Sequence, residues 1–287
     1  MFSHALKDAQ TRVQLALDEA MSGLDGSVAE AMRYTCQGGK RLRAFLVMES
    51  ARLHSVPAAQ ADRAAAAIEA VHAYSLVHDD LPCMDDDDLR RGNPTVHIKW
   101  DEATAVLTGD ALQTLAFEVL ADPRTGDADV RVALVSSMAK AAGAAGMVLG
   151  QALDIEAESA SEPLTLEQIT RLQAGKTGAL IEWSACAGAL MGRADPAPLR
   201  RYAQALGLAF QIADDIMDIE GDAAKAGKRL QKDAEAGKAT FVSLLGMEPA
   251  RARAKSLVQE ACDALSPYGD GAENLKAAAS FVISRDA

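Results

Sequence analysis

The stretch HAYSLVHDDLPCMDDDDLRRGNPT, residues 72–95, joins the end of an apolar helical pattern to a dense run of aspartates. Asp79, Asp80 and the run Asp85–Asp88 place six carboxylates within ten residues, and two arginines follow them. Like charges held this close in a fold repel one another unless a positive group lies among them. The stretch therefore predicts a helix end at which carboxylates face a cation.

The helix that ends in this stretch should carry His72 and Asp79 on one side, because seven residues make about two helical turns. Pro82 makes continuation of the helix difficult. Asp85 follows Asp79 by six residues, a spacing that would point the two carboxylates apart on an unbroken helix. We therefore expect a bend after Asp80 that returns Asp85 to the side of Asp79.

A second acidic cluster lies in FQIADDIMDIEGD, residues 210–222. At about 100° per residue, one narrow stripe of this helix holds four polar side chains while Asp215 is turned aside. The other faces are apolar. A solvated face would be broader and would mix lysines with its acids, so we favour a functional stripe over that alternative. Its members are Gln211, Asp214, Asp218 and Asp222.

Clustered carboxylates suit a hard divalent cation such as Mg²⁺, which takes one or two carboxylates and completes its shell with water and phosphate oxygens. A calcium loop of the EF-hand type is excluded, since DDLPCMDDDDLR lacks the central glycine and the glutamate at position twelve. For Asp85–Asp88, a plain acidic surface loop remains an alternative.

Short basic groups, each beside a glycine, could hold an anionic ligand in this acidic chain. Arginine suits bidentate phosphate contacts, and lysine acts as a point charge. A P-loop is excluded in AGKTGAL, because Thr170 stands where that pattern requires glycine and no strand precedes it. The basic residues are Lys40, Arg41 and Arg43 in GGKRLR, Arg90 and Arg91 in LRRG, Lys176 in GKTG, and Lys228, Lys232 and Lys238 in GKRLQKDAEAGK.

Composition indicates an all-α protein. The chain has 287 residues, of which 49% are hydrophobic and only 4% aromatic, and helical periodicity runs through nearly all of it. We expect about ten helices in one domain, residues 1–287, with Ala64–Val77 and Thr177–Met191 buried because they are apolar nearly all round. Gly143, Gly146 and Gly150 are expected to permit close packing along one helical stretch.

Charge and cysteine content limit the partners and the compartment. The net charge of −12 argues against nucleic-acid binding. Four isolated cysteines and the lack of an apolar leader pattern predict a cytoplasmic protein. The apolar stretch Ala179–Gly192 is too short to span a membrane.

Taken in order, the motifs of this chain resemble those of the trans-prenyltransferases, the short-chain isoprenyl diphosphate synthases. The resemblance covers nearly the whole chain, and the spacing of the first aspartate motif is similar to that of bacterial farnesyl diphosphate synthases. It implies a single-domain isoprenoid synthase bundle around a central cavity, a homodimer, and three Mg²⁺ ions, with Mn²⁺ as an alternative. The motifs are GGKRLR, the stretch quoted first, LTGDALQTLAFEVL, GQALDIEAE, KTGALI, LAFQIADDIMDIEGD and GKAT.

The resemblance also implies roles for individual residues. Asp79, Asp85, Asp214 and Asp218 match metal ligands. Lys40, Arg43, His72 and Arg91 match the site for the diphosphate of isopentenyl diphosphate, and Arg90, Lys176, Lys228 and Lys238 match groups that hold the allylic diphosphate. Thr177 and Gln211 match residues beside the developing carbocation, and the implied catalytic set is Asp79, Asp85, Asp214, Lys176, Thr177 and Gln211. Ala44, Asn93 and Gln231 depart from the family pattern.

The implied reaction condenses isopentenyl diphosphate with dimethylallyl and then geranyl diphosphate to give farnesyl diphosphate. Tyr74, about 7.5 Å before Asp79 along the helix, and the small Ser75 beside it are expected to set product length. Alternatives are a geranyl or geranylgeranyl diphosphate synthase, a class I terpene cyclase, a non-catalytic synthase subunit, and a metal-buffering protein. Retention of both aspartate motifs and of the isopentenyl diphosphate set disfavours the terpene cyclase and the non-catalytic subunit. A metal-buffering protein would be distinguished by binding Mg²⁺ or Ca²⁺ without diphosphate.

Overall fold

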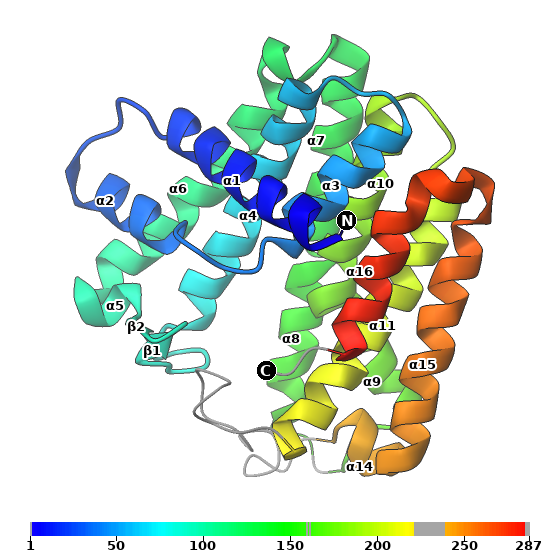
Figure 1. Cartoon of the computed structure of the whole chain (residues 1–287). Coiled ribbons are helices and arrows are strands. Elements are labelled where there is room, and N and C mark those ends of the chain that lie inside the picture. The colour runs from blue at the N-terminus through cyan, green and yellow to red at the C-terminus, as the bar shows by residue number, and fades with distance from the viewer. Residues whose placement is uncertain (1, 159, 161, 221–238, 285–287) are drawn as a thin grey trace. The chain divides into compact units, whose positions relative to one another are not determined.

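The computed structural model describes residues 2–158, 160, 162–220 and 239–284 (Figure 1). The described chain is helical apart from short connections and one hairpin, whose two strands have two residues each. The all-α prediction is therefore confirmed. It divides into two compact units, whose boundaries fall within two of the helices and in one connection between helices. The predicted site residues Asp222, Lys228, Lys232 and Lys238, and the departure Gln231, lie outside the described residues.

The first unit comprises residues 3–136 and 187–194. Its central helix is α4, whose residues from Ala64 to Val71 are buried on every side and which packs against α3 and α6 (Figure 1). Burial of Ala64–Val77 is thus largely as predicted. The elements are α1 (Phe2–Ala20), α2 (Gly26–Thr35), α3 (Leu42–Leu53), α4 (Ala58–Asp79), β1 (Leu89–Arg90), β2 (Asn93–Pro94), α5 (Val96–Lys99), α6 (Glu102–Ala121), the 3-10 turn Pro123–Thr125, and the start of α7 (Ala128–Ala142).

The second unit comprises residues 137–186 and 195–284, together with Phe2. In it α11 and α15 lie side by side (Figure 1), and Tyr202 of α11 is buried with its hydroxyl donating to Leu275 O at 2.8 Å. The elements are α8 (Met147–Glu158), α9 (Leu166–Gln173), the π-helical turn η2 (Ala174–Gly178), α10 (Ala179–Met191), α11 (Ala197–Glu220), α14 (Phe241–Leu245), α15 (Met247–Ala264), the 3-10 turn Ser266–Ala272, and α16 (Glu273–Ser284).

One sequence prediction about the glycines is wrong. Gly143 and Gly146 do not lie on one helix with Gly150, because a turn closed by Gly146 N donating to Gly143 O at 2.9 Å separates α7 from α8. Residues 128–157 are the one segment in the described ranges with the length and hydropathy of a membrane span. The turn divides it into helices of 15 and 12 residues, each shorter than the roughly 20 that a span needs.

The hairpin was not predicted, and its turn explains why it forms. Leu89 pairs with Pro94 and Arg90 with Asn93 in antiparallel register. The two residues between the strands, Arg91 and Gly92, have φ values of 53° and 76°. Positive φ at both positions is typical of the tight turns that match the twist of a two-stranded ribbon. The turn therefore places Arg91 at the tip of the hairpin, directly after Arg90.

Candidate active site

The first acidic motif bends as the sequence predicts. Helix α4 ends at Asp79, and the chain then turns so that Asp85 N donates to Asp79 O at 2.8 Å. The side chain of Asp79 is partly exposed and Asp85 is exposed. Two carboxylates that the helical repeat alone would point apart therefore leave the chain at the same turn.

Asp80, which lies between Asp79 and Asp85 in the sequence, forms an ion pair within the chain. It is buried, and Arg90 donates to its Oδ1 from Nε at 2.6 Å and from Nη2 at 2.5 Å. Burial raises the pKa of Asp80, and the Arg90 guanidinium opposes that shift. The pair ties the hairpin to the acidic turn. Arg90, predicted to hold the allylic diphosphate, thus has a partner within the chain.

The basic loop GGKRLR is organised by its middle cation. Arg41 is buried, has φ of 53°, and donates to Glu69 Oε2 of α4 at 3.0 Å. The other oxygen of Glu69 accepts from the backbone N–H of Ala44 at 3.0 Å. Arg41 also donates to Gln14 of α1 at 3.0 Å. Arg41 is therefore a structural cation, although the sequence groups it with the diphosphate-binding ones.

Glu69 and Gln14 were missed by the sequence reasoning. The only signal for Glu69 is an acid inside the apolar helix AAAAIEAV, one turn before His72. An isolated acid in a buried helix needs a buried partner. The backbone N–H at residue 44 exists because this chain has alanine where the resembled family commonly has proline.

Positive charge gathers around His72 on α4. The pKa of His72 lies well below its ordinary value because the ring is buried and because Arg43, Arg91, Arg90 and Arg41 lie around it. Within the described part of the chain, the buried Nε of Arg43 has no hydrogen-bond partner. A neutral imidazole among guanidinium groups and a donor still lacking an acceptor favour an anion at this place.

Gly39 lets Arg91 approach this group. A Cβ atom added at Gly39 would lie 2.8 Å from Nη1 of Arg91, and φ there is 87°. Gly38 has a similar φ of 67°, but no described atom lies within 4 Å of the corresponding Cβ position. Substitution of either glycine therefore strains the backbone, but only substitution of Gly39 also displaces Arg91.

Because the family resemblance assigns Arg91 to isopentenyl diphosphate, Gly39→Ala is expected to raise the KM for that substrate about 10-fold: displacing the Arg91 guanidinium would remove one charge-assisted contact. Steady-state kinetics with each substrate varied in turn will measure it. Gly38→Ala is the matched control and should leave that KM within about twofold of wild type. Equal effects of the two variants would mean that backbone strain, and not Arg91, is responsible.

The second acidic motif lies in the second unit, on α11. Gln211, Asp214 and Asp218 are all half-buried on this helix. Asp215 points elsewhere, since its Oδ2 accepts from the backbone N–H of Phe241 at 2.7 Å at the start of α14. The predicted orientation of Asp215 is confirmed, and the residue joins α14 to α11.

Lys176 and Thr177 lie in the π-helical turn η2 of the same unit. Single π-helical turns within helices are uncommon and occur often at functional sites. Lys176 Nζ donates to Asp154 Oδ2 of α8 at 2.7 Å. Gly178 contacts α11, because a Cβ added at Gly207 would lie 3.4 Å from Gly178 Cα. The KTGALI, GQALDIEAE and FQIADD motifs, distant in sequence, therefore meet in one unit.

The candidate chain-length residues lie in the first unit. Tyr74 is 5% exposed and packs edge-on against His78, with ring centroids 5.9 Å apart. Among the described residues, no hydrogen-bond partner with acceptable geometry reaches its buried hydroxyl, and burial raises the pKa of this phenol. Ser75 donates back to His72 O at 3.0 Å, so its hydroxyl is used by its own helix.

The donors present fit magnesium. No group of three or more His, Cys, Asp or Glu side chains converges into a metal site among the residues that the structure describes. Mg²⁺ seldom needs such an all-protein cage, since one or two carboxylates, water and substrate phosphates suffice. The Asp79–Asp85 turn and the Asp214–Asp218 face each offer carboxylate pairs of that kind.

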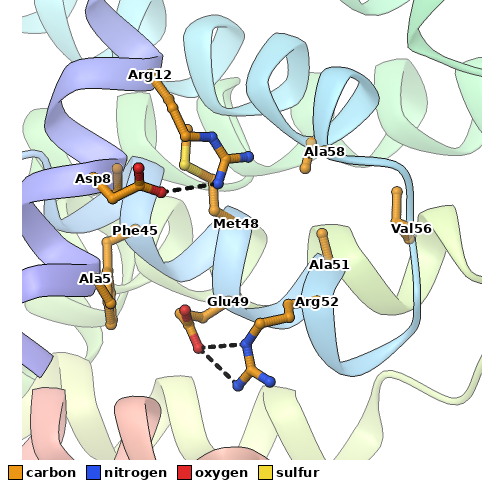
Figure 2. A pocket seen from close by; sticks show the side chains of 12 residues that line it. Ala5, Asp8, Arg12, Phe45, Met48, Glu49, Ala51, Arg52, Val56 and Ala58 are labelled. Atoms are coloured by element: carbon orange, nitrogen blue, oxygen red, sulfur yellow. Dashed lines mark hydrogen bonds and ion pairs between the residues drawn. The ribbon is translucent and has the colours of Figure 1, made fainter. Parts of the chain in front are cut away.

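A pocket of ≈ 160 Å³ also lies in the first unit, between α1, α3 and the start of α4, and no predicted site residue lines it (Figure 2). Figure 2 shows Arg12 directed at Asp8 and Arg52 at Glu49, and these pairs are 3.2 Å and 2.9 Å apart. Its charged side chains thus have partners within the chain.

Comparison with known proteins agrees with the motifs. The profile of the family described as Polyprenyl synthetase matches residues 26–270. The farnesyl diphosphate synthase of Escherichia coli is 47% identical over 90% of this chain and 89% of its own length, and that of Haemophilus influenzae is 42% identical over 99% and 98%. The apo crystal structure of an FPP/GFPP synthase from Zymomonas mobilis superposes with a TM-score of 0.89 at 43% identity, over 99% of this chain and 100% of that one.

Proposed function

This chain belongs to the polyprenyl synthetase family and is a prenyltransferase that elongates isoprenoid diphosphates, and from that premise we propose that it makes farnesyl diphosphate. The substrates would be isopentenyl diphosphate with dimethylallyl and then geranyl diphosphate. The observation that carries the proposal is the buried Nε of Arg43, which has no hydrogen-bond partner among the described residues, in the basic group that Arg91 joins over Gly39.

We assign the isopentenyl diphosphate to Lys40, Arg43, His72 and Arg91. Arg43 supplies the buried donor that has no acceptor among the described residues. Neutral His72 donates one N–H, and Arg91 approaches over Gly39. Holding the diphosphate here leaves the terminal double bond free to attack.

We assign the allylic diphosphate to Arg90 and Lys176. Lys228 and Lys238 are added to this set by resemblance alone. Magnesium bound at Asp79, Asp85, Asp214 and Asp218 would neutralise charge on the departing diphosphate. The allylic C–O bond breaks and its electron pair leaves with diphosphate. Thr177 and Gln211 direct their oxygens at the resulting cation, the π-bond of isopentenyl diphosphate closes the new C–C bond, and the released diphosphate accepts the proton.

Product length is the test of the farnesyl assignment. Incubation with isotopically labelled isopentenyl and dimethylallyl diphosphates and Mg²⁺, followed by chromatography, should give mainly the C15 product. A dominant C10 or C20 product would replace this assignment by a geranyl or geranylgeranyl synthase. A cyclised hydrocarbon formed without isopentenyl diphosphate would instead establish a terpene cyclase.

Tyr74→Ala is expected to lengthen the main product beyond C15, because removing the phenol opens the space that stops the growing tail. Tyr74→Phe keeps the ring, removes only the buried hydroxyl, and should keep C15. The same chromatographic assay measures both variants. Unchanged length in Tyr74→Ala would make Tyr74 an ordinary core residue.

We further propose a cytoplasmic homodimer. Supporting it, the first unit exposes large apolar side chains on two helices, Val106 and Leu107 of α6 and Val132 of α7, the last of them 68% exposed. Contiguous apolar patches mark protein interfaces, and Val106 and Leu107 are adjacent exposed apolar residues of this kind.

A further inference from the structure

Helix α8 meets the π-helical turn backbone to backbone at Gly150. A Cβ atom added at Gly150 would lie 1.9 Å from the backbone nitrogen of Lys176. A Cβ added at Gly175 would lie 3.0 Å from Gly150 Cα. At Gly150 no side chain larger than hydrogen fits without a backbone shift, and at Gly175 a side chain would be tight, so this contact sets the position of the Lys176 backbone.

The same helix also holds the other end of Lys176. Asp154 follows Gly150 by four residues, which places the two on one face of α8. Asp154 is 9% exposed, and its Oδ2 accepts from Lys176 Nζ at 2.7 Å. A buried carboxylate paired with an ammonium restricts a side chain that otherwise has several freely rotating bonds.

Lys176 can keep this partner and still bind substrate. Its ammonium carries three donors, of which Asp154 uses one, and the lysine side chain is 27% exposed. On the other side of the turn, Gly178 rests on Gly207 of α11. Gly207 precedes Gln211 and Asp214 by four and seven residues, so all three share a face of α11.

We propose that Gly150 and Asp154 are positioning residues for the allylic diphosphate, acting through Lys176. Gly150 places the backbone of the π-helical turn, and Asp154 aims the ammonium at the phosphate. The inference rests on the proposed function and deepens it, because it gives Gly150 and Asp154 of the GQALDIEAE motif a role that they exert through Lys176.

Asp154→Asn tests the second half of the proposal. The KM for geranyl diphosphate should rise about 10-fold, while the KM for isopentenyl diphosphate stays within about twofold. Calorimetric titration with an unreactive thiolo analogue of geranyl diphosphate should show the same loss of affinity. Asp154→Glu keeps the charge and should recover part of it. Unchanged affinity for the analogue in Asp154→Asn would overturn the proposal.

Gly150→Ala tests the first half, with Gly188→Ala as the matched control. A Cβ at Gly188 would lie 2.1 Å from Ala51 N, an equally tight backbone contact that does not involve Lys176. Both variants should lose thermal stability, but only Gly150→Ala should weaken binding of the analogue. Equal binding by the two folded variants contradicts a positioning role. If Gly150→Ala does not fold, the affinity of Asp154→Asn for the analogue decides the proposal by itself.

The outcomes separate this inference from the proposed function. If the wild-type enzyme forms no prenyl product, the proposed function fails, whatever the variants do. If the wild-type enzyme is active and Asp154→Asn binds the analogue as tightly as wild type, only the positioning role fails.

Discussion

Replacing Asp79 or Asp214 by alanine is expected to lower the turnover number at least ~10²-fold, the size of effect seen when one electrostatic contact to a transition state is removed. Each carboxylate belongs to a pair suited to Mg²⁺, Asp79 with Asp85 at the bend and Asp214 with Asp218 on α11. With Mg²⁺ held as proposed, losing one member would leave charge on the departing diphosphate uncompensated. Steady-state assays with saturating substrates and Mg²⁺ measure the loss.

Neighbouring aspartates serve as controls of equal charge. Asp88 is exposed, and its backbone carbonyl, not its side chain, accepts from Thr95 N. Asp88→Ala should therefore keep turnover within about twofold. Asp215→Ala loses the bond to Phe241 and should lower stability by roughly 1 kcal/mol with little effect on chemistry. Near-normal turnover of Asp79→Ala or Asp214→Ala would remove that residue from the metal site.

Glu69→Ala is expected to lower the free energy of unfolding by ~3–5 kcal/mol, because it leaves the guanidinium of Arg41 buried without its counter-charge. The two side chains are only 3% and 4% exposed, and their N–O distance is 3.0 Å. The substitution also leaves the Ala44 N–H without its acceptor. Against a typical total of about 5–15 kcal/mol, such a loss brings the protein close to unfolding.

Chemical denaturation monitored by circular dichroism measures this effect. Glu69→Gln keeps an acceptor near Arg41 and gives a milder variant that stays measurable. The double replacement Arg41→Met with Glu69→Leu should be more stable than Glu69→Ala, since it removes both charges together. A loss below about 1 kcal/mol in Glu69→Ala would show that water reaches Arg41 and that the pair is not structural.

Local geometry along one helix was predictable. The turning aside of Asp215 follows from the helical repeat alone, and the structure shows it bonded to Phe241. The return of Asp85 to Asp79 follows from the repeat together with Pro82, which stops α4. Both depend on residues within about two turns of one another, whose relation the backbone dictates.

The predictions failed where neighbouring residues allowed two conformations. The sequence predicts a helix through Gly143 and Gly146, because glycine can adopt helical backbone angles. The chain instead forms a turn there. The π-helical turn at Ala174–Gly178 has no sequence signature of its own. It lies where glycines of the turn contact α8 and α11. Glycine has no strong preference, so its neighbours in space determine its conformation.

For this protein, periodicity and composition were enough to establish an all-α chain and to predict the faces that carry its carboxylates, and the resemblance of its motifs indicated the family to which it belongs. Only packing decided which cationic side chains stabilise the fold and which are left to bind substrate. Arg41 and Arg43 are equivalent in the sequence, yet one is paired with Glu69 and the other keeps a buried nitrogen without a partner in the described chain. Coulomb attraction and burial depend on distances between residues far apart in the chain, and those distances exist only after the helices have packed.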